Sequence, residues 1–82
     1  MDTILIKRLF IEKFNSILNL DYNKIFNDDN QNMLEKNNVD PAELVYIIKE
    51  TVNTIGTPIH VQPFRGEVSL NNIVTFIISL FK

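Results

Sequence analysis

The sequence contains no cysteine, only two glycines and a single histidine, and each scarcity removes a class of function. Without cysteine, the chain can form no disulfide, no thiol nucleophile and no thiolate zinc site. Gly56 and Gly66 are too few for a glycine-rich phosphate loop, and His60 alone cannot form the histidine cluster that holds a transition metal. We therefore predict a protein without catalytic residues, cofactor or metal, rather than an enzyme.

Charge of either sign is also limited. The 8 basic and 10 acidic side chains give a formal net charge of −2, which disfavours binding driven by nucleic-acid phosphates. The hydrophobic stretch 73–81 is less than half of the ~20 residues that a membrane-spanning helix needs, and no signal-peptide pattern opens the chain. We expect a cytoplasmic protein that binds neither nucleic acid nor membrane.

The 82 residues, of which 45% are hydrophobic, suffice for one small folded domain over residues 1–82. Hydrophobic residues recur at three- and four-residue spacing over 3–18, 41–55 and 70–81, which predicts a helix in each stretch. The stretch 19–40 is rich in Asn and Asp, and we expect a long ordered loop there, pinned to the core by its apolar residues. The chain is therefore predicted to be all-α.

Residue types that start and stop helices mark the limits of the last two helices. Asp40 suits the N-cap position, Pro41 the first helical position and Glu43 the third, where it can complete a capping box. Gly56 is expected to end this helix, and Ser69 suits the N-cap of the last one. The segment between Gly56 and Ser69 is predicted to be irregular or briefly extended.

The same spacing predicts which faces of these helices are buried. Tyr46 and Ile47 fall outside the tightest core stripe of the helix 41–55. Its predicted core side consists of Ala42, Leu44, Val45, Ile48, Val52 and Ile55. The last helix is hydrophobic nearly all round, so it is either deeply buried or in contact with a partner, such as a second copy in a homodimer.

The order of these elements resembles the acyl carrier protein family. That family is a small four-helix bundle with a long loop after its first helix and a very short third helix. Its signature, Leu-Gly-x-Asp-Ser-Leu-(Asp)-x-x-Glu-Leu, opens the second helix, and its serine carries phosphopantetheine. The run 34–45 aligns with this signature without a gap, with matches at Leu34, Asp40, Glu43, Leu44 and Val45, and with Val39 in place of Leu. The resemblance implies an acyl-carrier-like four-helix bundle with a short or irregular third helix.

The residue that carries the family's cofactor is absent from this chain. Asn38 occupies the serine position and Asn37 the position of the preceding aspartate. An amide has no hydroxyl to attack the phosphoanhydride of coenzyme A, so phosphopantetheine cannot be attached at Asn38. The resemblance therefore implies a carrier-shaped protein that has lost the carrier chemistry.

One alternative keeps that chemistry. The run 66–70, Gly-Glu-Val-Ser-Leu, mimics the signature and would make Ser69 the modified residue. This placement leaves a single helix after the serine and no segment to close the bundle. Ser69 is better explained as the N-cap of the last helix.

A carrier-like protein would meet a protein partner at the start of its second helix. We predict a partner-binding surface there, in which Val39, Tyr46 and Ile47 are the anchors and Asp40 and Glu43 supply polarity. This face is less acidic than the corresponding face of the family. Electrostatic steering toward a partner would therefore be weak.

The resemblance also implies a role. Serine-free relatives of acyl carrier proteins accompany bacterial peptide-maturation genes, including those of bacteriocin biosynthesis. By this analogy, the chain is a non-catalytic adaptor that docks on a biosynthetic or modifying enzyme. Two alternatives stay open: a true carrier modified at Ser69, and an unrelated small helical adaptor that dimerises through its last helix.

Overall fold

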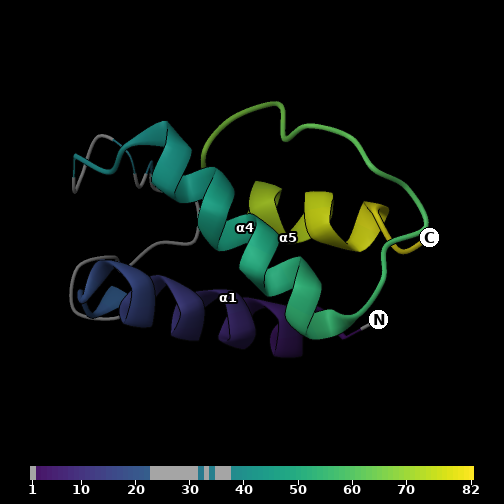
Figure 1. The fold of residues 1–82 in the computed structure, drawn as a ribbon, viewed down its shortest axis with the longest axis horizontal. Helices are drawn as coiled ribbons and strands as arrows, with labels where there is room; N and C mark the ends of the chain where they lie inside the picture. Colours follow the sequence, from purple (N-terminus) through teal and green to yellow (C-terminus); the bar gives the residue numbers. More distant parts are fainter. Residues whose placement is uncertain (1, 23–31, 33, 35–37) are drawn as a thin grey trace.

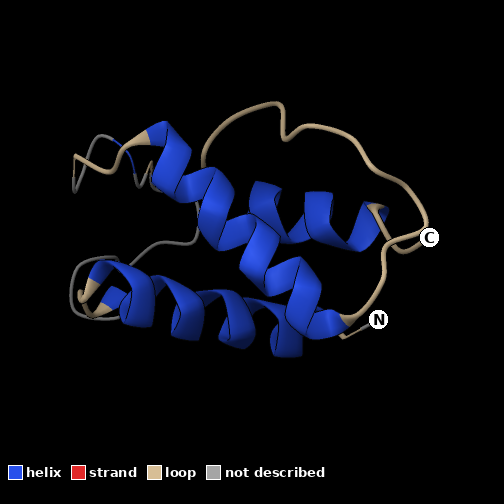
Figure 2. Cartoon of the chain, viewed as in Figure 1, coloured by secondary structure: helices blue, strands red, loops and turns tan. Residues whose placement is uncertain are grey.

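The described part of the chain is all-α (Figures 1 and 2). The computed structural model describes residues 2–22, 32, 34 and 38–82. Within them, three helices form: α1 (Thr3–Leu18), α4 (Pro41–Ile55) and α5 (Leu70–Ser79). Helix α1 packs against both α4 and α5, and α4 also packs against α5. The start of α1 and the end of α5 lie at the same side of the molecule (Figure 1).

Helix α1 forms where the hydrophobic spacing predicts it. Its buried residues, Ile6, Phe10 and Phe14, follow each other at four-residue intervals and so share one face. The Asp2 carboxylate accepts a hydrogen bond from the amide of Ile4 at 2.9 Å and caps the first turn. Asn19 ends the helix in the left-handed conformation that Asn tolerates better than most residues. The predicted limits are confirmed.

Helix α4 also has its predicted limits, with the predicted N-cap residue and proline in place. Asp40 accepts a hydrogen bond from the amide of Ala42 at 2.9 Å, and Pro41 follows at the first helical position. At the other end, Gly56 adopts φ 153° and ψ −158°, a conformation that is essentially restricted to glycine. Local signals therefore determine both ends of this helix.

The prediction of which face of α4 is buried was wrong, because the buried face is rotated by part of a turn from the predicted one. Ile47 is 0% exposed, whereas Val45 is 56% exposed. The buried residues are Leu44, Ile47, Ile48, Thr51 and Val52. The stripe includes Thr51, whose hydroxyl donates to the carbonyl oxygen of Ile47 at 2.8 Å and can therefore be buried without loss of a hydrogen bond. Counting only apolar residues excludes Thr51 and shifts the predicted face toward Val45.

Helix α5 supplies a large share of the core. Ser69 caps it by accepting a hydrogen bond from the amide of Asn72 at 3.2 Å, as predicted. Leu70, Ile73, Val74 and Ile77 are buried along its main row. The helix ends at Ser79, and Leu80 continues in a turn. Phe76, Ile78 and Phe81 are partly buried against the core, so its own chain covers much of this hydrophobic helix.

The connection 57–68 contains no helix and arches from the end of α4 to the start of α5 (Figure 1). The amides of Ile59 and His60 both donate to the carbonyl oxygen of Leu80, at 2.8 and 3.0 Å. Farther along, the rings of Phe64 and Phe76 meet edge to face with centroids 5.2 Å apart. These contacts tie the connection to α5, in line with the irregular segment that the sequence predicts.

Most of the predicted loop 19–40 lies outside the described residues. One of its expected anchors is visible: Tyr22 is buried, and its ring meets Phe14 edge to face at 5.3 Å. Leu34 is partly buried against the core. The segment is thus held to the core at these two described positions, where the chain is helical and not the loop that the sequence predicts.

Candidate functional site

The first candidate site is the approach to α4, where the resemblance puts the phosphopantetheine position. Asn38 is exposed and adopts a left-handed conformation with φ 53°. Helix α4 begins three residues later, at Pro41, so Asn38 stands outside the helix. Asn37 lies outside the described residues. The exposed amide side chain of Asn38 can form hydrogen bonds, but it offers no nucleophilic hydroxyl.

Two of the five predicted partner-binding residues are buried. Ile47 lies in the centre of the core, and Val39 is 7% exposed. The prediction that these two side chains are surface anchors is therefore wrong. Ile47 was misplaced because the core stripe includes Thr51, and Val39 packs inward just before the N-cap.

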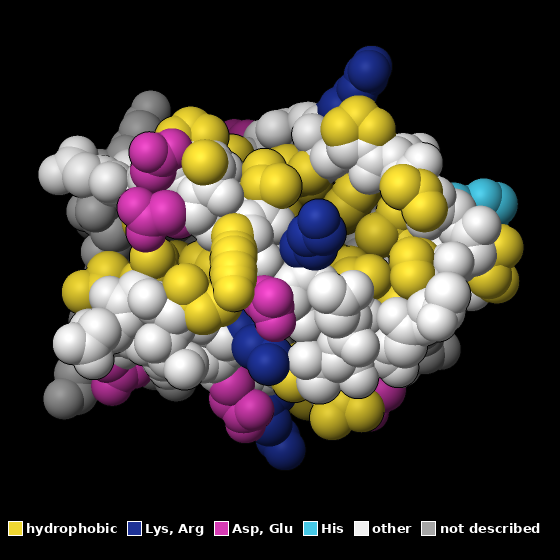
Figure 3. All heavy atoms as spheres, viewed as in Figure 1, with side chains coloured by type: hydrophobic (Ala, Val, Ile, Leu, Met, Phe, Trp, Pro, Cys, Tyr) yellow, Lys and Arg dark blue, Asp and Glu magenta, His cyan; other side chains and the backbone are white. Residues whose placement is uncertain are grey.

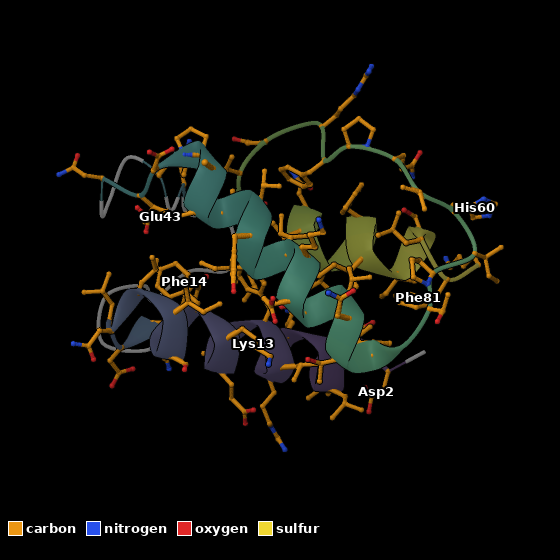
Figure 4. All side chains as sticks on the ribbon, in the orientation of Figure 1. Asp2, Lys13, Phe14, Glu43, His60 and Phe81 are labelled. Carbon is orange, nitrogen blue, oxygen red and sulfur yellow. The ribbon has the colours of Figure 1, made fainter. Side chains whose placement is uncertain are left out.

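The other three residues remain on the surface. Asp40 and Glu43 are exposed at the first turn of α4, and Tyr46 is 48% exposed one turn later. Glu43 and Tyr46 are three positions apart and therefore neighbours on the helix surface. Figure 4 shows that Glu43 and His60 lie at opposite ends of the molecule. The approach to α4 is thus a polar surface with one aromatic side chain.

Ser69, the alternative site of modification, is 2% exposed. Its hydroxyl oxygen accepts the α5 capping hydrogen bond described above. A phosphopantetheinyl transferase would have to reach this hydroxyl through the surrounding residues and break the cap. The burial therefore argues against modification at Ser69.

A second candidate site is a groove bounded by α4, the connection 57–68 and α5, with a volume of about 330 Å³. We call it the α4–α5 groove. Its lining includes Val45, Lys49, Val52, Val61, Phe64 and Phe76. This volume is at the small end of the ~300–1,000 Å³ typical of ligand pockets.

The α4–α5 groove combines hydrophobic walls with positive charge. Figure 3 shows a Lys or Arg side chain among hydrophobic ones, beside a hollow with a hydrophobic floor. Lys49 and His60 are its only lining residues that can carry charge, within the described part of the chain. His60 also donates through Nε2 to the backbone oxygen of Lys82, at 2.8 Å. The groove therefore suits a ligand that is apolar at one end and negatively charged near it.

Sequence reasoning missed this groove. It assigned Val45 to the core, whereas Val45 lines the groove together with Lys49. The positions are four residues apart and share a helix face, which was an available signal. Which residues of the connection come opposite them is not encoded in any local pattern.

Comparison with known proteins adds no assignment: no family model, curated protein or solved structure matches the chain. Among the described residues, no helix has both the length and the hydrophobicity needed to cross a membrane. The same part of the chain contains no group of three or more His, Cys, Asp or Glu side chains placed to hold a metal ion.

Proposed function

We propose that this chain is a non-catalytic, acyl-carrier-like adaptor that binds a biosynthetic or modifying enzyme of a bacterial peptide-maturation pathway. The observation that carries the proposal is the position of Asn38. This exposed residue lies just ahead of the capped helix α4, at the position where the carrier family has its serine. Leu34, Asp40, Glu43 and Leu44 keep the residues of the signature, whereas Asn37 and Asn38 replace its Asp-Ser pair. Such a chain can retain a docking surface without a phosphopantetheine arm.

The fold belongs to the same proposal. The chain would form an acyl-carrier-type four-helix bundle in which the irregular connection 57–68 replaces a regular third helix. The capped α4 and α5, both packed against a long first helix, support this arrangement. A cytoplasmic location follows from the proposed pathway.

The proposed docking surface is the exposed part of the predicted one: Asp40, Glu43 and Tyr46, together with Asn38. Tyr46 offers a large apolar ring with a polar tip, which is typical of residues that contribute strongly to interfaces. The two carboxylates beside it favour a partner surface with at least one basic side chain.

The proposal is tested by incubating the purified chain with coenzyme A and a broad-specificity phosphopantetheinyl transferase. We expect intact-protein mass spectrometry to find an unchanged mass, because Asn38 has no hydroxyl and the Ser69 hydroxyl is buried. A working carrier protein in the same reaction is the positive control. A gain of one phosphopantetheine group, lost in Ser69→Ala, would instead identify a true carrier.

A reciprocal variant tests the resemblance itself. Asn37→Asp combined with Asn38→Ser restores the Asp-Ser pair of the signature. We expect this variant to gain one phosphopantetheine group, to a lower extent than the working carrier because residue 38 precedes the helix. Asn53→Ser, which puts a hydroxyl at an exposed position within α4, is the matched control and should stay unmodified.

A further inference from the structure

The α4–α5 groove lies beside the proposed docking surface on α4 but is lined by other residues. Val45 and Lys49 line the groove, whereas Glu43 and Tyr46 do not. At 100° per residue, Tyr46 is rotated by about 60° from Lys49 around the helix, and Glu43 by about 120°. The groove therefore needs an occupant of its own.

We propose that the α4–α5 groove binds an acidic peptide segment of a protein partner, which inserts one apolar side chain between α4 and the connection 57–68. This inference rests on the adaptor function proposed above and names the chemistry of one partner segment. The hydrophobic walls supply the anchor site, and Lys49 supplies the charge that selects an acidic segment.

The walls of the groove are built to hold an apolar side chain. Val61 is 92% exposed and Val45 is 56% exposed, although both are apolar. Phe64 and Phe76 close one side with their edge-to-face contact. Covering these side chains would remove apolar area from water, which is the main driving force for such association. A volume of about 330 Å³ has room for one large side chain but not for a whole folded element.

Charge complementarity selects the segment. Lys49 lies in the wall of the groove, whereas its neighbour in sequence, Glu50, and the exposed Arg65 are not lining residues. No Asp or Glu lines the groove among the described residues. A carboxylate beside the inserted side chain would meet Lys49, whereas a basic segment would be repelled.

A second copy of this chain is a less suitable occupant. It would offer Tyr46 between Glu43 and Glu50, which has the required chemistry. However, Tyr46 does not line the groove of its own chain, so its insertion into a second copy joins two different surface patches. Such a contact is head-to-tail and continues into an open polymer unless a two-fold axis makes it reciprocal or the rotation closes a ring. The proposal therefore commits to a segment from another protein.

The test begins with a random-peptide phage library selected against the full chain. We expect enriched peptides to carry an aromatic or branched apolar residue flanked by Asp or Glu. Their affinity, measured by fluorescence polarisation, should fall about five-fold or more in Lys49→Glu. Lys13→Glu makes the same charge change on α1, outside the groove lining, and should leave the affinity unchanged (Figure 4).

Amide chemical shifts of the labelled chain then locate the bound peptide, and shifts confined to the groove lining support the proposal. Enrichment of basic peptides, failure to enrich any, or equal affinity for Lys49→Glu would overturn it. Two other outcomes would also overturn the proposal. In the first, sodium octanoate changes the amide chemical shifts of the groove lining when no peptide does. In the second, the chain self-associates as its concentration rises, and Lys49→Glu abolishes this self-association. These results leave the phosphopantetheine test untouched, so failure of the groove proposal is distinguishable from failure of the adaptor function.

Discussion

Ile47 and Val45 stand two positions apart on α4 in opposite environments. Ile47 contributes to the core with no exposed surface, whereas more than half of the Val45 side chain is open to water. Thr51 lies on the same buried face as Ile47, and its hydroxyl donates to the carbonyl oxygen of Ile47. Burial of this polar side chain therefore leaves no hydroxyl unsatisfied and is compatible with the observed face.

This difference in burial predicts that two side-chain truncations on α4 lower the free energy of unfolding by different amounts. Ile47→Val removes a single methylene group from a packed site and should lower the free energy of unfolding by about 1 kcal/mol. Val45→Ala removes more atoms but should change it by less than about 0.5 kcal/mol, since the site is exposed. Urea denaturation followed by circular dichroism measures both. An equal or larger loss for Val45→Ala would contradict the observed face of α4.

At the scale of the element, α4 is defined by its two ends. The Asp40 carboxylate satisfies an amide that the helix leaves unpaired, and Pro41 fits the first position because it needs no amide partner. Gly56 then turns the chain out of the helix, while its amide still donates to the carbonyl oxygen of Val52 at 3.0 Å. The direction in which the connection 57–68 leaves α4 therefore depends on Gly56.

Substitution of that glycine should be costly even though space is available. Nothing lies within 4 Å of a Cβ atom placed on Gly56, so Gly56→Ala meets no clash. The cost is backbone strain of about 1–3 kcal/mol, because alanine rarely adopts this conformation. Thermal and urea unfolding should both detect it. The control, Asn53→Ala at an exposed position of α4, should be neutral or slightly stabilising.

At the scale of the whole molecule, the connection 57–68 determines whether the groove exists. Its backbone is held at Leu80 near the end of α5, and its side chains are held by the contact between Phe64 and Phe76. Between these attachments it stands away from α4 and leaves the hollow visible in Figure 3. The groove is therefore the space between α4 and a connection that is attached to the last helix at these two places.

Removal of one of these two attachments should make the connection 57–68 open more often. Phe64→Ala removes the ring contact and should lower the free energy of unfolding by about 1 kcal/mol. It should also speed hydrogen exchange at the amides of Ile59 and His60, because their bonds to Leu80 would open more often. Phe64→Leu keeps apolar contact and should show a smaller effect. Unchanged exchange in both variants would mean that the Leu80 bonds hold the connection without the aromatic pair.

The features that could be predicted from the sequence are those that depend on residues close together in the chain. The caps at Asp40 and Ser69 follow from side chains that bond the nearby backbone, and the end of α4 follows from the backbone freedom of Gly56. Asp40, Glu43 and Tyr46 are exposed, in agreement with a surface that was predicted from the carrier resemblance and from helical spacing.

Which helix faces are buried, and which segments far apart in the chain come into contact, depends on the tertiary structure. Val39 packs inward ahead of the N-cap, and Ile47 shares the buried face of α4 with the polar Thr51, which a pattern of apolar residues does not encode. The α4–α5 groove joins α4 to residues 58–64 and to α5, and such contacts depend on the path of the whole chain. Local bonds set the ends of the helices, whereas packing of the complete chain set their rotation and the space between them.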